Sequence, residues 1–120
     1  MTNPSAVSTN WWPTSVPPVG HPRHIELLQK WCLDQAPSVL REYPVVHRHL
    51  AVLLLLTRNH LEGCLHSARQ AYSQMRVQLA PLQAPETVAA ALTATAAIGK
   101  DYAQSLAFVD EMWAAHIEPE

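Results

Sequence analysis

Apolar residues recur every three or four positions along most of the chain, the spacing that places them on one face of an α-helix. The first such stretch begins after Pro22 and is interrupted at Ala36-Pro37. Its apolar positions are Ile25, Leu28, Trp31 and Cys32. A short turn over residues 38–43 leads to Pro44, which suits the first turn of a helix because its missing N–H would have no partner there. No segment alternates apolar and polar residues with period two, so the pattern predicts an all-α fold.

Two longer stripes follow, over residues 44–79 and 85–117, separated by a turn around Pro81. The first stripe consists of Val46, Leu50, Leu53, Leu54, Leu61, Leu65, Ala68, Tyr72, Met75 and Leu79. The second consists of Val88, Leu92, Ile98, Tyr102, Leu106, Val109, Met112 and Trp113, with Thr95 as its one polar member. It opens at Pro85-Glu86, a proline and an acid in the first turn, where the helix dipole favours an acid.

Each long stripe contains one glycine near its middle, Gly63 and Gly99, and glycine is the residue that most often ends a helix in a left-handed conformation. Unbroken helices of more than thirty residues would also exceed the usual length. We therefore expect each half to break into two shorter helices, giving short, repeat-like helical hairpins. The alternative is a small antiparallel helical bundle, with both helices continuous about the turn at 80–84 and Gly63 opposite residues 99–101.

The N-terminal 21 residues differ from the rest, because proline, serine and threonine are too frequent there to sustain a helix or a strand. We expect a flexible arm over residues 1–21 and a single all-helical domain over residues 22–120. Two large rings, Trp11 and Trp12, lie inside the arm and are costly to leave in water. They either cover a groove of the chain's own domain or dock on another chain.

The C-terminal half resembles a tetratricopeptide or pentatricopeptide helical repeat. The resemblance lies in Gly99-Lys100-Asp101-Tyr102 followed by AQSLAFVDEMWAAHIEPE, and Gly63 through SARQAYSQM to Pro81 is similar to a degraded copy. Gly63 and Gly99, Ala71 and Ala107, and Tyr72 and Phe108 each recur at 36 residues. The resemblance implies helical hairpins that must stack on a neighbour to hide their apolar faces.

The chain departs from the base-reading positions of the pentatricopeptide family, which fall here on Ala90 and Glu120. Alanine offers a base no hydrogen bond, and Glu120 is the last residue given. The resemblance therefore implies the scaffold more than the reading of RNA.

Composition narrows the function classes. Hydrophobic residues make up 48% of the 120-residue chain and charged residues 15%, enough to fill one core. The net charge is −2 and the eight basic residues are scattered, which disfavours nucleic acid as a partner. The longest apolar run, Leu50 to Leu56, is far shorter than the roughly 20 residues of a membrane span. Two cysteines in so apolar a domain favour reduced thiols, and we expect a cytoplasmic protein.

The stretch HLEGCLH, His60 to His66, is the candidate for chemistry. With His47 and His49 it supplies nitrogen and sulfur donors for zinc, but those two histidines point about 200° apart on a helix, so the ligands do not converge. A nucleophilic Cys64 would take His60 or His66 as its base and Glu62 to orient that base. We identify no oxyanion donors or substrate cleft, so we predict no catalytic residues, no metal site, no cofactor and no enzyme activity.

The sequence therefore predicts a protein–protein interaction module or small adaptor. Its mechanism is docking of a partner helix, or of a second copy in a homodimer, into an apolar groove. The partner-binding candidates are Trp11, Trp12, Trp31 and Trp113. Two alternatives stay open: an RNA-binding helical-repeat fragment, and a His/Cys metal or redox protein.

Overall fold

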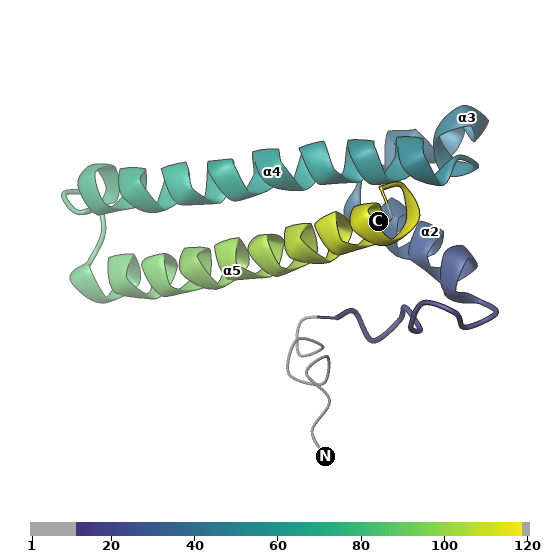
Figure 1. Cartoon of the computed structure of the whole chain (residues 1–120). Helices are drawn as coiled ribbons and strands as arrows, with labels where there is room; N and C mark the ends of the chain where they lie inside the picture. The colour runs from purple at the N-terminus through teal and green to yellow at the C-terminus, as the bar shows by residue number, and fades with distance from the viewer. Residues whose placement is uncertain (1–11, 119–120) are drawn as a thin grey trace, which may run out of the picture.

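In the computed structural model, which describes residues 12–118, two long antiparallel helices form a hairpin, and shorter segments pack against one end of it (Figure 1). The hairpin consists of α4 (Leu50–Gln74), a π-helical turn η3 (Met75–Leu79) and α5 (Pro85–His116). The shorter segments are α2 (His24–Gln35), the 3₁₀ turn η2 (Ser38–Glu42) and α3 (Pro44–His47). No strand occurs in residues 12–118, so the prediction of an all-α fold is confirmed.

The expected helix breaks at Gly63 and Gly99 are wrong, because α4 and α5 continue through them. Gly20 is the only residue in the described part of the chain with a positive φ, at 98°, so neither helical glycine adopts the left-handed conformation that ends a helix. A single glycine costs a helix only about 1 kcal/mol relative to alanine, and the strong helix formers around each position offset that cost. Of the two predicted arrangements, the antiparallel hairpin with continuous helices is the one observed.

The register of the hairpin also differs from the one predicted. A Cβ built on Gly99 would lie 3.7 Å from the Ala68 Cβ, so Gly99 faces Ala68 across the hairpin. A Cβ on Gly63 would meet no atom within 4 Å. The glycines therefore do not face each other, and only Gly99 sits at the crossing of the two helices. The resemblance to tetratricopeptide and pentatricopeptide repeats stays a prediction, but the helix boundaries that it placed at these glycines do not occur.

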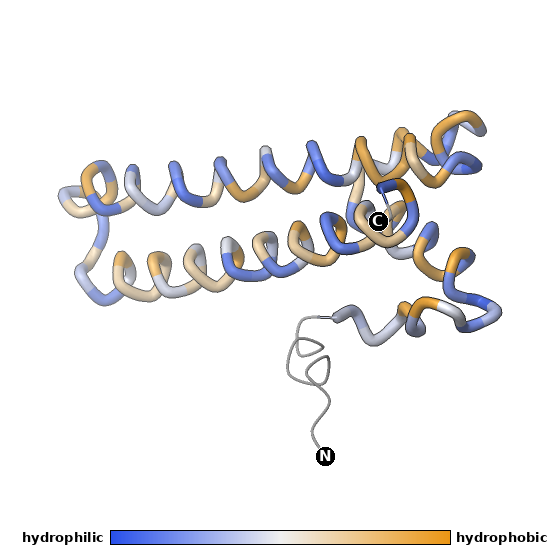
Figure 2. Tube along the Cα trace, in the orientation of Figure 1, coloured by the Kyte–Doolittle hydropathy of each residue, from blue (hydrophilic) through white to orange (hydrophobic). Residues whose placement is uncertain are grey.

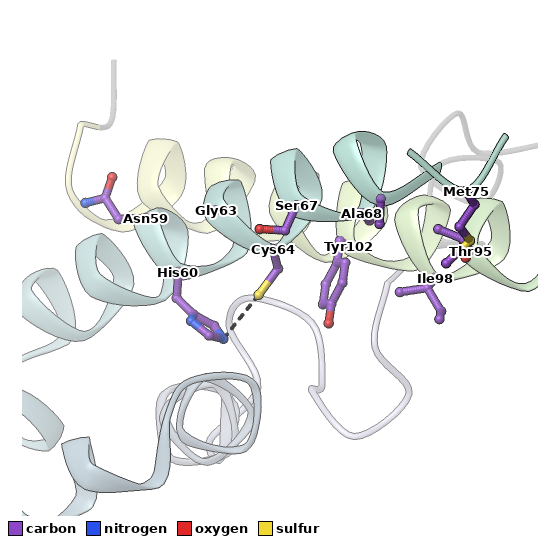
Figure 3. A pocket seen from close by; sticks show the side chains of 11 residues that line it. Asn59, His60, Gly63, Cys64, Ser67, Ala68, Met75, Thr95, Ile98 and Tyr102 are labelled. Atoms are coloured by element: carbon purple, nitrogen blue, oxygen red, sulfur yellow. Dashed lines mark hydrogen bonds between the residues drawn. The ribbon is translucent and has the colours of Figure 1, made fainter. Parts of the chain in front are cut away.

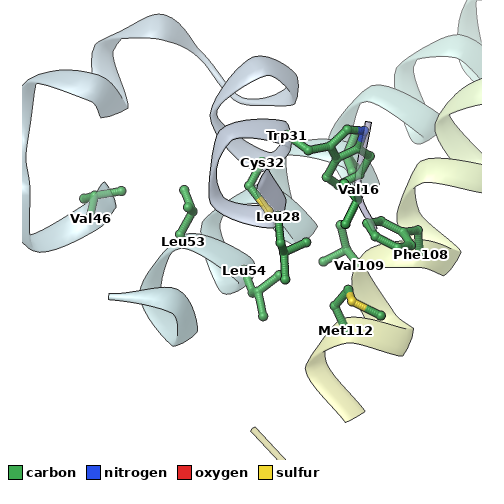
Figure 4. Close-up of a cluster of buried hydrophobic side chains, with 11 residues drawn as sticks. Val16, Leu28, Trp31, Cys32, Val46, Leu53, Leu54, Phe108, Val109 and Met112 are labelled. Carbon is green, nitrogen blue, oxygen red and sulfur yellow. The ribbon is translucent and has the colours of Figure 1, made fainter. Parts of the chain in front are cut away.

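The core lies entirely at the end of the hairpin on which α2 and α3 pack, here called the proximal end (Figure 4). There α2 forms a third layer against α4 and α5. The buried apolar residues are Val16, Leu28, Trp31, Cys32, Val46, Leu53, Leu54, Leu61, Phe108, Val109 and Met112. Arg58 Nε and Asp110 Oδ1, 2.9 Å apart, tie α4 to α5 at the same end.

The core extends into the segment that the sequence assigned to the arm. Val16 is only 3% exposed and belongs to the buried cluster, and its amide donates to the Pro13 carbonyl at 3.2 Å. The part of the arm that the structure describes thus packs on the bundle. Residues 1–11 lie outside the described residues, and the expectation of a flexible arm stays a prediction for them.

Candidate interaction surface

Two of the four candidate tryptophans meet in the core. The rings of Trp12 and Trp31 pack edge-on against Phe108, with centroid distances of 4.8 Å and 4.9 Å. The Trp12 indole Nε1 donates to the Val16 carbonyl at 2.7 Å, which satisfies its one polar group. Trp31 is 7% exposed and has little surface left for a partner. The described part of the arm therefore places Trp12 against the chain's own core.

Of the other two tryptophans, the structure describes only Trp113. Trp113 is half-buried and packs against the core near the end of α5. Trp11 lies outside the described residues. Trp12 and Trp31 pack into the core and Trp113 packs against it, and the assignment of the four tryptophans as partner-binding residues stays a prediction.

The HLEGCLH stretch lies on one unbroken helix, which keeps His60 and Cys64 on the same face. His60 Nε2 and Cys64 Sγ are 3.4 Å apart and hydrogen-bonded, and Tyr102 of α5 lies next to the thiol (Figure 3). Charge repulsion from the Cys64 thiolate raises the pKa of Tyr102, with burial as a smaller cause. His66 is exposed and takes no part in this cluster.

The remaining donors proposed for chemistry do not converge on Cys64. Glu62 is exposed and its Oε1 lies 4.0 Å from Arg58 Nε, so it does not orient His60. In residues 12–118 no group of three or more histidine, cysteine or acidic side chains is arranged to hold a metal ion. The arrangement offers one hydrogen-bonded thiol–imidazole pair at the edge of an open groove.

Two grooves flank the hairpin beyond the proximal end, one on each side. The thiol groove, about 640 Å³, contains the Cys64–His60 pair with Ala71, Ile98 and other residues, and its lining holds no lysine, arginine or carboxylate (Figure 3). The basic groove, about 500 Å³, is lined on the other side by Arg69 and Lys100 among mainly uncharged residues. It has no carboxylate in its lining.

Residues 63–99, here called the distal half, are all described by the structure and contain a single buried residue, Thr95. The Thr95 hydroxyl donates to the Ala91 carbonyl at 2.8 Å and also contacts Met75 Sδ at 3.4 Å. All other side chains of the distal half are half-buried or exposed, including Ile98 at 49%. Two helices that pack only on each other bury one side of each helix and leave the remaining sides in water.

The α5 helix carries no charged residue from Thr87 to Gly99, a stretch of 13 residues. Eight of these residues are exposed, and together they cover the sides of the helix that do not face α4: Thr87, Ala89, Ala90, Thr93, Ala94, Ala96, Ala97 and Ile98. In Figure 2 this part of α5 is tan, orange and pale. From Lys100 onward the same helix has charged residues on its exposed face, as a solvated helix does.

A histidine pair, with His24 buried and His116 half-buried, joins the start of α2 to the end of α5. His24 is 2% exposed, its Nδ1 donates to the Pro17 carbonyl at 2.7 Å, and its Nε2 lies 2.9 Å from His116 Nε2. Because a carbonyl only accepts, His24 carries its proton on Nδ1, and His116 donates to His24 Nε2 in the neutral pair. Burial lowers the pKa of His116, and repulsion from His24 adds to the effect.

The sequence contains a signal for the uncharged stretch of α5 but none for the histidine pair. The absence of charge over residues 87–99 is visible in the sequence, although its alanines suggested only a narrow surface for close helix approach. The His24–His116 pair, 92 residues apart, has no sequence signal, because the two positions meet only once α2 lies along α5.

No family model matches the chain, and no curated protein or solved structure is significantly similar to it. Within the described residues, each helix is too short or too polar to cross a membrane.

Proposed function

We propose that this chain is a non-catalytic protein–protein interaction module, and that the distal half of its α4–α5 hairpin docks helices of another polypeptide. The observation that carries the proposal is the exposed, uncharged surface of α5 between Thr87 and Gly99. A helix that lacks charge all around is normally buried among other helices. Here only α4 and the η3 turn that continues it pack against this stretch within residues 12–118, so further helices are needed to cover it.

The contrast between the two ends of the hairpin supports this assignment. At the proximal end, α2 and the Trp12 segment complete a core of eleven buried apolar residues. In the distal half no third layer is supplied by residues 12–118, and Thr95 is the one buried residue. Contiguous apolar surface of this kind on a small domain marks an interaction site. The proposed docking surface therefore moves from the tryptophans to the distal half of the hairpin.

We also propose a reducing compartment such as the cytoplasm. Both cysteines are free thiols, Cys32 in the core and Cys64 at the edge of the thiol groove, and neither is needed as a covalent link.

Photo-cross-linking tests the proposed function. A benzophenone amino acid replaces Ala94 in the distal half or, as the matched control, Ala115 on the same helix at the proximal end, and both positions are exposed. After irradiation in the cells that naturally produce the chain, we expect covalent adducts from position 94 well above those from position 115. Equal or absent adducts from the two positions would overturn the function.

A further inference from the structure

We propose that the occupant of the distal half is a second copy of this chain, docked antiparallel on the thiol-groove side so that α5 lies on α5 and α4 lies on α4 of the two protomers. This inference rests on the proposed function and specifies its partner, its face and its register. Three features of the described residues carry it: the course of α2, the charges of the two grooves and the shape of the uncovered face.

The thiol-groove side is the face that α2 already covers at the proximal end. His24 meets His116 and Trp31 meets Phe108, so α2, which packs mainly on α4, also covers the last part of α5 as far as Phe108 through these two side chains. The covered stripe of α5 continues toward the turn at helical spacing of three and four residues. Its members are Met112, Phe108, Ser105, Asp101, Ile98 and Ala94. The second copy would extend the third layer that α2 begins.

Charge excludes the opposite face for a symmetric partner. A two-fold interface presents the same patch from both protomers, so each charged group is duplicated across it. Pairing through the basic groove would double the charges of Arg69 and Lys100 with no carboxylate in the lining to offset them. The thiol groove has no lysine, arginine or carboxylate in its lining, so two copies meet there without like-charge repulsion.

The shape of the uncovered face sets the register. The face is bounded by α2 at one end and by the turn between α4 and α5 at the other. In a parallel pair the two α2 helices would clash. The two copies therefore lie antiparallel, and the α2 of each copy lies beyond the turn of the other. The two-fold axis then crosses α5 near the middle of residues 85–104, close to Ala94. Alanines around this point let two helix backbones approach closely.

The same register accounts for the one carboxylate on the stripe. Asp101 is seven residues after Ala94 and Thr87 is seven before it, so the axis at Ala94 places Asp101 beside Thr87 of the other copy. Thr87 lies in the first turn of α5, which begins at Pro85. The Thr87 and Val88 N–H groups already donate to the Ala84 carbonyl, so the positive end of the helix dipole and the Thr87 hydroxyl are what favour a carboxylate there.

The area of the face is adequate for a stable dimer. Twenty helical residues span about 30 Å and two packed helices are about 20 Å wide, which gives on the order of 600 Å² in projection. A corrugated helical surface exposes more than its projection, and a standard interface buries about 800 Å² per partner.

Matched substitutions test the face and the register in the full-length chain. Ala94→Glu places a carboxylate on the thiol-groove side, next to its own copy, and Ala96→Glu places one in the basic groove two residues away. Both positions are exposed, and circular dichroism checks that both variants stay helical. By sedimentation velocity we expect Ala94→Glu to weaken dimerisation by at least about 100-fold, since it buries two facing charges, and Ala96→Glu to change it by less than about threefold. In a Cys64→Ser background, we further expect Ala94→Cys to form a disulfide-linked dimer under mild oxidation and Ala96→Cys not to.

A chain that stays monomeric at all concentrations would overturn the second copy as occupant. If adducts still form from position 94 in cells, the proposed function survives with a different partner, which separates the two failures. A dimer that Ala96→Glu disrupts as strongly as Ala94→Glu, or that neither variant disrupts, would overturn the face. A dimer that fails to link through Ala94→Cys would overturn the register.

Discussion

Replacing the two helical glycines by alanine tests the continuity of α4 and α5. A Cβ on Gly63 meets nothing within 4 Å, and a Cβ on Gly99 makes an ordinary contact with Ala68 at 3.7 Å, so neither methyl group clashes. Alanine is favoured over glycine inside a helix by about 1 kcal/mol, largely because glycine loses more backbone entropy on folding. We expect Gly63→Ala and Gly99→Ala each to raise the free energy of unfolding by about 0.5–1 kcal/mol.

The matched control is Gly20, whose φ of 98° places it where an L-residue is strained. There alanine should lower the free energy of unfolding by about 1–2 kcal/mol. Urea unfolding followed by circular dichroism, at one low protein concentration for all variants, measures the three changes. If helices ended at Gly63 and Gly99 in a left-handed conformation, their alanine variants would be destabilised like Gly20→Ala, and that result would refute the continuous hairpin.

Three further predictions concern the core and its titratable groups. Trp12→Ala and Phe108→Leu should show a coupling free energy of about 0.5–1.5 kcal/mol in a double-mutant cycle of urea unfolding, and strict additivity would contradict the edge-on contact. Because the pKa of His116 is lowered in the folded state, stability should be full above its unfolded value of about 6.5 and decrease as the pH falls through that value toward the folded one. His116→Gln should flatten this dependence in thermal melts between pH 8 and 5, and an unchanged profile would count against the histidine pair. Burial raises the pKa of Cys32 to about 12, so mass spectrometry should find Cys64 alkylated by iodoacetamide well before Cys32 at pH 8, and equal rates would contradict the buried position of Cys32.

The helices of the hairpin follow from local patterns that are legible in the sequence. Apolar spacing of three and four residues located both long segments, and Pro85-Glu86 marked the start of α5 at the residue where it begins. The continuity of these helices through Gly63 and Gly99 could not be predicted from the sequence in the same way. A helix can either end at a glycine or continue through it. The helix propensities of the neighbouring residues and the packing of the helix decide which occurs.

The surface that we propose for docking was harder to predict than the helices. The tryptophans suggested a docking site because their rings are large and hydrophobic. Whether such a ring is buried in the chain's own core or exposed to a partner depends on the side chains that pack beside it. The ring of Phe108 packs against those of Trp12 and Trp31, which are distant from it in the sequence. No local sequence pattern predicts these contacts. The more useful signal was the absence of charge over residues 87–99, which becomes informative once the structure shows that nothing within residues 12–118 besides α4 and the adjoining η3 packs there.

The molar mass of the intact chain in solution tests most directly whether a second copy covers the distal half of the hairpin, as we propose. Light scattering over a series of concentrations should give twice the 13.3 kDa of a single chain at micromolar concentration and above. Dilution should shift the mass toward 13.3 kDa in a single reversible step. A mass of 13.3 kDa at every concentration would contradict the account.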